Sequence, residues 1–158
     1  MKKFLLFFLS ILSLLFILPT QSFAQNTTDT SYDVTYSVYP SGTTHTIFSV
    51  ALKNNTSDYY VSSYSVQIGF TDIENVQAFD SGGIITPIVK KNENGYLITL
   101  HFNKQIVGLH TVLKFTLVFD TPDVAQKTGQ IWELNIPGIG KEGNFSDFNV
   151  TEIGRAHV

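Results

Sequence analysis

Two short motifs in this sequence carry the residue types of acid–base chemistry. Asp80-Ser81-Gly82 matches the Asp-Ser/Thr-Gly signature of aspartic proteases, and the other candidate is Asp120-Thr121-Pro122. Such an enzyme needs two of these motifs, because its two carboxylates share one proton. Pro122 replaces the required glycine in the second motif, and Asp-Ser-Gly is also an ordinary turn that ends a strand. We therefore expect Asp80 to be a turn residue, unless a homodimer uses it twice.

Other catalytic and metal-binding sets are incomplete. Many serines and the histidines His45, His101 and His110 could supply a Ser–His–Asp set, but no Gly-x-Ser-x-Gly elbow is present. His101 and His110 flank a loop and could meet, yet a zinc site needs a third ligand, which is not obvious. The absence of cysteine excludes a cysteine nucleophile. We expect no catalytic, cofactor-binding or metal site and no cofactor.

Acidic and aromatic side chains leave two weaker alternatives open. Asp120 and Asp123 flank a proline turn, and Asp72 and Glu74 are close in sequence, but neither pair forms a known calcium loop. The tyrosines could form a stacking surface for sugars, although aromatic residues also favour strands. We expect these tyrosines to be ordinary strand residues and not a surface for sugars. These tyrosines are Tyr32, Tyr36, Tyr39, Tyr59, Tyr60, Tyr64 and Tyr96.

The alternation of apolar and polar residues predicts strands throughout the central part of the chain. Period two is clear over residues 32–38, 96–102, 111–119 and 131–136, and turn residues separate these runs. Asn94-Gly95 is a strong hairpin signal, and Pro87 suggests an edge strand or a bulge. No window has a sustained helical period. The pattern predicts an all-β, antiparallel β-sandwich of the immunoglobulin-like or aminopeptidase-N-terminal-like kind.

The core of this sandwich must carry its stability, because no disulfide can form. The residues that we expect between the two sheets are Val50, Val66, Ile68, Leu100, Phe115, Leu117 and Trp132. Truncating Phe115 should be severe, whereas Asp123→Ala should hardly change stability.

The first residues have the pattern of a signal peptide. Lys2 and Lys3 precede an apolar run over residues 4–18, and Ser22-Phe23-Ala24 is a suitable cleavage site. The run is shorter than the roughly 20 residues that span a bilayer. We expect cleavage after Ala24, so that the protein is secreted or lies at the cell surface, with no membrane segment after cleavage.

The last residues, 152–158, resemble a translated sequencing adapter, and Arg155 is the only arginine in the chain. We therefore expect a non-native, disordered tail and a natural sequence that continued differently after Thr151. The predicted organisation is a signal peptide at 1–24, a flexible leader at 25–31, a β-sandwich domain at 32–151 and this tail. Residues 25–151 hold seven lysines and twelve acidic residues, a net charge of −5, which disfavours nucleic-acid binding.

Residues 32–136 resemble the N-terminal β-domain of exported transglutaminase-like proteins from uncultured bacteria of the candidate phyla. The segments that carry the resemblance are 36–38 with 42–45, 52–56 followed by Tyr59 and Tyr60, 73–80, and 125–127 with 130–137. In those proteins a papain-like domain with a Cys–His–Asp set lies downstream. The resemblance implies that this chain is a non-catalytic module whose partner is the following domain of the same protein, or a cell-surface protein or glycan. The alternative is a stand-alone adhesion or carbohydrate-binding module, and a small secreted hydrolase is a third.

Overall fold

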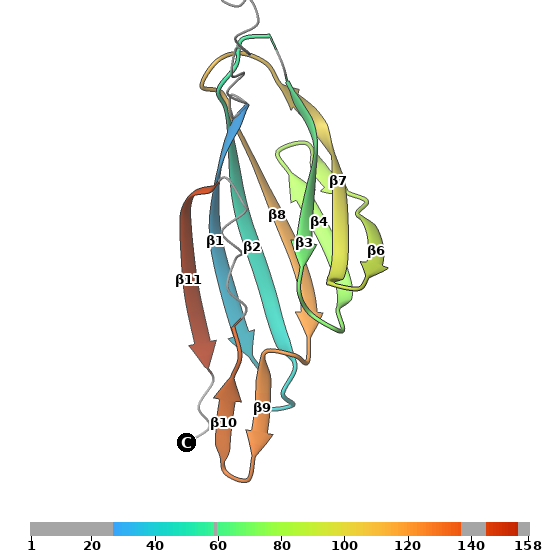
Figure 1. The fold of residues 1–158 in the computed structure, drawn as a ribbon, viewed down its shortest axis with the longest axis vertical. Helices are drawn as coiled ribbons and strands as arrows, with labels where there is room; N and C mark the ends of the chain where they lie inside the picture. The colour runs from blue at the N-terminus through green and yellow to red at the C-terminus, as the bar shows by residue number, and fades with distance from the viewer. Residues whose placement is uncertain (1–26, 59, 137–144, 155–158) are drawn as a thin grey trace, which may run out of the picture.

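The computed structural model describes residues 27–58, 60–136 and 145–154, and these residues form an all-β structure (Figure 1). The strands are β1 (Thr28–Val38), β2 (Thr44–Asn54), β3 (Val61–Ile68), β4 (Glu74–Asp80), β5 (Gly83–Ile85), β6 (Ile88–Asn92), β7 (Gly95–Ile106), β8 (Val112–Thr121), β9 (Ala125–Thr128), β10 (Ile131–Leu134) and β11 (Phe145–Gly154). The described part of the chain contains no helix that is long and apolar enough to cross a membrane. The predicted signal peptide lies outside the described residues.

The larger sheet has six strands in the order β11-β1-β2-β8-β4-β5. Its neighbouring strands are antiparallel except for β11, which runs parallel to β1 from Thr30↔Phe145 to Val38↔Gly154. The expectation of a purely antiparallel sandwich is therefore wrong at this edge. A parallel neighbour requires a crossover connection, and alternation along one strand does not reveal its direction.

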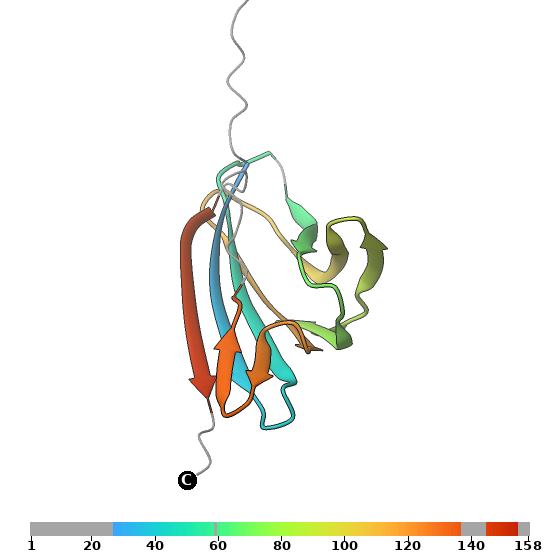
Figure 2. The same cartoon turned by 60° about the horizontal axis from the view of Figure 1, so that its bottom comes forward.

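The smaller sheet has three antiparallel strands in the order β3-β7-β6, and it faces the larger sheet (Figure 2). Asn94 and Gly95 connect β6 to β7 in the hairpin that the sequence predicts. Pro87 separates β5 from β6, and each of these strands is at the edge of its sheet, as expected for a proline that cannot donate a ladder hydrogen bond. Strands β9 and β10 form a separate hairpin.

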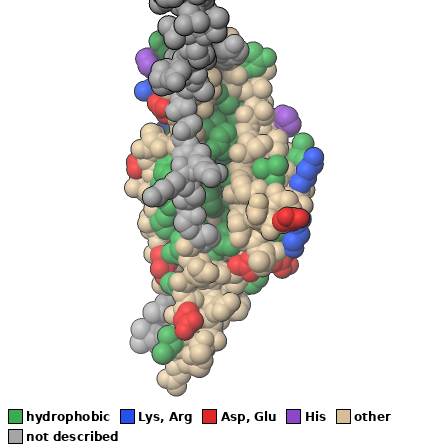
Figure 3. Space-filling view, in the orientation of Figure 1, with side chains coloured by type: hydrophobic (Ala, Val, Ile, Leu, Met, Phe, Trp, Pro, Cys, Tyr) green, Lys and Arg blue, Asp and Glu red, His purple; other side chains and the backbone are tan. Residues whose placement is uncertain are grey.

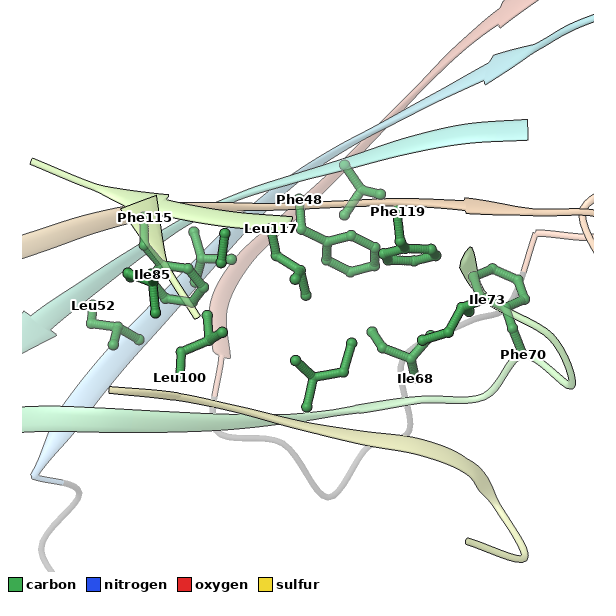
Figure 4. Packing of buried hydrophobic residues seen from close by; sticks show 14 of the residues in the cluster. Phe48, Leu52, Ile68, Phe70, Ile73, Ile85, Leu100, Phe115, Leu117 and Phe119 are labelled. Atoms are coloured by element: carbon green, nitrogen blue, oxygen red, sulfur yellow. The ribbon is translucent and has the colours of Figure 1, made fainter. Parts of the chain in front are cut away.

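Buried side chains from both sheets form one core (Figure 4). In β2 and β8 every second residue is buried, so that Phe48, Leu117 and Phe119 point from the larger sheet towards Ile68 and Leu100 of the smaller one. This is the period-two arrangement of a sandwich.

Most of the expected core residues are in that core, and one is not. Val50, Ile68, Leu100, Phe115 and Leu117 are buried, and Val66 is half-buried. The expectation that Trp132 is buried is wrong, because its side chain is 36% exposed in the β9–β10 hairpin. The hairpin projects beyond the two sheets, so its alternating pattern does not place a residue between them.

Two predicted boundaries also differ from the structure. The leader was expected to be flexible to Ser31, but β1 begins at Thr28, because residues 28–31 pair with β2. Glu152 to Gly154, expected to be disordered, continue β11 beside Tyr36, Ser37 and Val38. Their non-native origin stays a prediction, and residues 155–158 lie outside the described part.

Candidate functional site

Asp80 connects the two sheets at the end of β4. Its Oδ1 accepts hydrogen bonds from the backbone N–H of Gly82 at 2.7 Å and from Asn103 Nδ2 at 3.0 Å, and its Oδ2 accepts the Asn103 N–H at 2.7 Å. Asn103 belongs to β7, and its side chain also donates to the carbonyl oxygen of Ile84. The carboxylate thus holds the β4–β5 turn against the opposite sheet, which is a structural role for the protease-like motif.

The ionised form of Asp80 is favoured by these contacts. Burial by itself would raise the pKa of the carboxyl group, but the hydrogen bonds from Asn103 and Gly82 outweigh it and lower the pKa below its ordinary value. Asp120 behaves in the same way: burial opposes ionisation, and the hydrogen bonds from Asn75 and His45, with the charge of His45, lower its pKa.

Acid should therefore destabilise the fold through these two aspartates. Their pKa values are lower in the folded than in the unfolded chain, so the unfolded chain binds more protons as the pH falls. The stabilisation is complete above the ordinary value of 3.8 and is lost as the pH falls through the lowered folded values. Urea unfolding across this range should show it, and Asp80→Asn should flatten the dependence. Asp58→Asn removes the same negative charge from an exposed loop and is the matched control for the loss of charge.

Asp120 and Asp123 do not combine into a calcium site. Asp120 contacts His45, Nδ1 to Oδ1 at 2.6 Å, and accepts a hydrogen bond from Asn75 Nδ2 at 2.7 Å. Asp123 instead accepts hydrogen bonds from the N–H and hydroxyl groups of Thr71. No group of three or more His, Cys, Asp or Glu side chains among the described residues could hold a metal ion.

The contacts of Asp123 contradict the expectation that its removal is harmless. Its carboxylate also accepts the N–H of Asp72 at 3.1 Å, so that it fixes the loop between β3 and β4. Asp123→Ala should lower the free energy of unfolding by about 1 kcal/mol, because water can reach the groups that it releases. The midpoint of urea unfolding measures this. Asp58→Ala removes an equally charged side chain from another loop and should change the midpoint little.

The three histidines in the described part of the chain do not form one site. His45 is in β2, where the register places it between Ser37 of β1 and Asp120 of β8. This Ser–His–Asp row comes from three strands, so sequence spacing could not reveal it. Nucleophilic catalysis needs the serine hydrogen-bonded to the histidine, and the described contacts of His45 include only its bond to Asp120. His101 is exposed in β7, and His110, also exposed, has φ 63° before β8.

The tyrosines that the structure describes are distributed over the fold and do not line one surface. Tyr36 is 2% exposed, and burial raises its pKa to about 12. The hydroxyl groups of Tyr32 in β1 and Tyr64 in β3 form a hydrogen bond between the sheets, and burial, followed by this bond, raises the pKa of Tyr32. Tyr39 and Tyr60 are exposed. Tyr59 lies outside the described residues.

The β9–β10 hairpin projects beside the end of β1 (Figures 1 and 2), and both carry exposed apolar side chains. We call this set the apolar pole: Tyr39, Ile131, Trp132 and Leu134, which are 36–68% exposed. A Cβ atom at Gly42, in the β1–β2 turn, would lie 3.6 Å from the Trp132 ring, and Lys127 Nζ lies 5.5 Å from its centroid. The ring is thus held in place while part of it faces solvent. In Figure 3 hydrophobic and acidic side chains lie together at the hairpin end.

The outer face of the larger sheet contains a polar hollow of about 360 Å³. Four adjacent strands line it, because the register aligns two rows of side chains that point away from the core. The rows are Asp147–Ser31–Ala51–Lys114 and Asn149–Asp33–Ser49–Thr116. We call this the outer-face hollow. Its residues lie far apart in the sequence, and the pattern of each strand by itself predicts only a half-buried strand, not a shared hollow.

Comparisons with known proteins identify no family. No family model matches the chain, and no curated protein matches it. Among solved structures, the M1 zinc metallopeptidase from Deinococcus radiodurans is similar with a TM-score of 0.40 and 14% identity, over 64% of this chain and 22% of that chain. A two-domain M1 zinc metallopeptidase mutant bound to L-tryptophan gives a TM-score of 0.40 and 16% identity, over 73% and 26%. This chain thus spans about a quarter or less of those chains.

Proposed function

We propose that this chain is a non-catalytic, extracytoplasmic β-sandwich module of a larger secreted or surface protein, and that its apolar pole contacts the adjacent domain. The single observation that carries the proposal is the projecting β9–β10 hairpin, on which Ile131 is 68% exposed and Leu134 is 38% exposed. Because the hairpin projects beyond the two sheets, the apolar side chains of its alternating strand stay exposed and do not contribute to the sandwich core. Clustered exposed apolar side chains are typical of contact surfaces.

The direction of β11 supports a neighbouring domain as the occupant. Because β11 is parallel to β1, Thr151 lies beside Thr35, and β11 runs towards the β1–β2 turn. The described chain therefore leaves the sheet at the same end as the hairpin (Figure 1). A domain that follows this module would begin next to the apolar pole, which gives it a short path to that surface.

Two parts of the proposal rest on the sequence alone, and a third rests on the sequence together with the packing of the sheets. The pattern of residues 1–24 supports export, and the segments between residues 32 and 136 support a transglutaminase-like affiliation. The immunoglobulin-like or aminopeptidase-N-terminal-like class of the sandwich is the third. The alternation and turn residues support it, together with the packing of a three-stranded sheet on a six-stranded one.

Self-association of the isolated module tests whether the apolar pole is a contact surface. Residues 25–151, purified, should associate at micromolar concentration, because the apolar pole lacks its partner. Ile131→Ser should shift sedimentation towards the monomer. Ile84→Ser is the matched control, since Ile84 is 76% exposed but lies on β5, away from the hairpin. A monomeric wild-type module, or equal effects of the two substitutions, would contradict the proposed contact.

Trp132 allows the partner itself to be tested, because it is the only tryptophan in the chain. The gene should be amplified from genomic DNA past codon 151, and the longer protein compared with residues 25–151. We expect the reading frame to continue into a cysteine-bearing domain. We also expect acrylamide to quench Trp132 less strongly in the longer protein than in residues 25–151. A frame that stops soon after codon 151 would favour the stand-alone module.

A further inference from the structure

We propose that the outer-face hollow is a binding site for a glycan that carries free amino groups. The site is separate from the apolar pole and does not depend on the function proposed above. Its first feature is shape. The two central strands, β1 and β2, contribute the small side chains of Ser31, Ser49 and Ala51 together with Asp33, and longer polar side chains stand on β11 and β8 at the two sides.

The second feature is charge that no neighbour neutralises. Asp33 and Lys114 are exposed, and the described residues provide neither side chain with an ion pair or a hydrogen bond. Asp147 accepts one hydrogen bond, from Asn149 Nδ2 at 3.3 Å. Lys114 on β8 is three strands from Asp147 on β11, roughly 14 Å at the usual strand spacing. This distance is too long for an ion pair, so the charges remain available to a ligand.

The third feature is the chemistry of the lining. Carboxylates accept hydrogen bonds from adjacent sugar hydroxyl groups, and the Asn149 amide and the serine hydroxyls can both donate and accept. Two carboxylates, Asp33 and Asp147, on neighbouring strands favour a cation on their side of the hollow, which a sugar amine supplies. On the opposite side, Lys114 can donate to hydroxyl or ring oxygens. A nucleic acid is disfavoured, since its phosphates would meet the carboxylates.

The length of the hollow also fits an oligosaccharide. The two rows follow the direction across the strands, and they are two residues apart, roughly 7 Å along each strand. The site is therefore an elongated strip across β11, β1, β2 and β8. Such a strip accommodates a short extended chain of sugar rings better than a single compact ligand.

Calorimetric titration with three tetrasaccharides tests the proposal: fully deacetylated chitotetraose, N-acetylated chitotetraose and cellotetraose. At mildly acidic pH, where the sugar amines are charged, the deacetylated probe should bind most tightly, and added salt should weaken its binding. Asp33→Asn should weaken this binding about 10-fold, the effect of one charge-assisted hydrogen bond. Asp58→Asn removes the same charge from an exposed loop and should change the affinity by less than about twofold.

Several results would overturn the proposal. Equal weakening by Asp33→Asn and Asp58→Asn would mean attraction to the net charge only. Binding of cellotetraose as tight as that of the deacetylated probe would contradict the role of the amino group, and no binding of any probe would contradict the site. Asp33 is exposed, so its substitution should leave the thermal melting curve unchanged, which separates a binding effect from unfolding. None of these binding outcomes depends on whether the module self-associates through the apolar pole.

Discussion

Replacing Phe115 by alanine is expected to lower the free energy of unfolding by about 3–5 kcal/mol. Phe115 is 3% exposed and lies where the sheets meet: its ring centroid is 5.2 Å from that of Phe102 in β7 and 5.6 Å from that of Tyr64 in β3. Truncation removes contacts with β3 and β7, two of the three strands of the smaller sheet, and leaves a cavity that a packed core cannot close fully. A domain of this size has only about 5–15 kcal/mol of stability in total, so the loss is severe.

Urea unfolding followed by far-ultraviolet circular dichroism measures the effect of Phe115→Ala. Lys114→Ala is the matched control, because Lys114 precedes Phe115 in β8 and points to the opposite, exposed face. It should change the free energy of unfolding by no more than about 0.5 kcal/mol. If Phe115→Ala costs less than about 1 kcal/mol, the two sheets do not pack through this ring.

Gly95→Ala is expected to be at least as damaging, although it adds only one carbon atom. Gly95 has φ 109°, and a Cβ atom there would lie 2.2 Å from the carbonyl oxygen of Ile68 and 2.9 Å from that of Phe70. These are backbone atoms, so β3 and the loop after it must move away from the β6–β7 hairpin. We expect a loss of more than about 3 kcal/mol, beyond the upper end of backbone strain alone.

Gly83 provides the control that separates strain from collision. It has φ 121°, and a Cβ atom there would meet nothing within 4 Å. Gly83→Ala should therefore cost only the conformational strain, about 1–3 kcal/mol. Thermal melting of the two variants compares them directly. Equal losses would show that β3 does not press against Gly95 in solution.

The core strands could be predicted from the sequence because alternation is a local property. Each of Val50, Ile68, Leu100, Phe115 and Leu117 has apolar neighbours two residues away, and all five are buried. The Asn94-Gly95 turn was predictable for the same reason, since left-handed backbone favours glycine. Trp132 shows the limit of this reasoning: its strand alternates too, but whether a second sheet covers that strand is decided by residues elsewhere.

The candidate sites depended still more on tertiary structure. The sequence indicated that Asp80 belongs to a turn, but its bonds to Asn103 join residues 23 positions apart. The bonds of Asp123 to Thr71 span 52 positions, which is why its stabilising role was missed.

The sequence by itself determined the all-β class and the positions of most turns, because these follow from residue type and short-range spacing. Only the tertiary structure decided that β11 joins β1 in parallel, that the β9–β10 hairpin leaves Trp132 partly exposed, and that Asp33, Asp147 and Lys114 share one hollow. Each of these depends on strand pairing between distant segments. The register of such pairing is set by which apolar faces the whole chain can bury together, and no single strand contains that information.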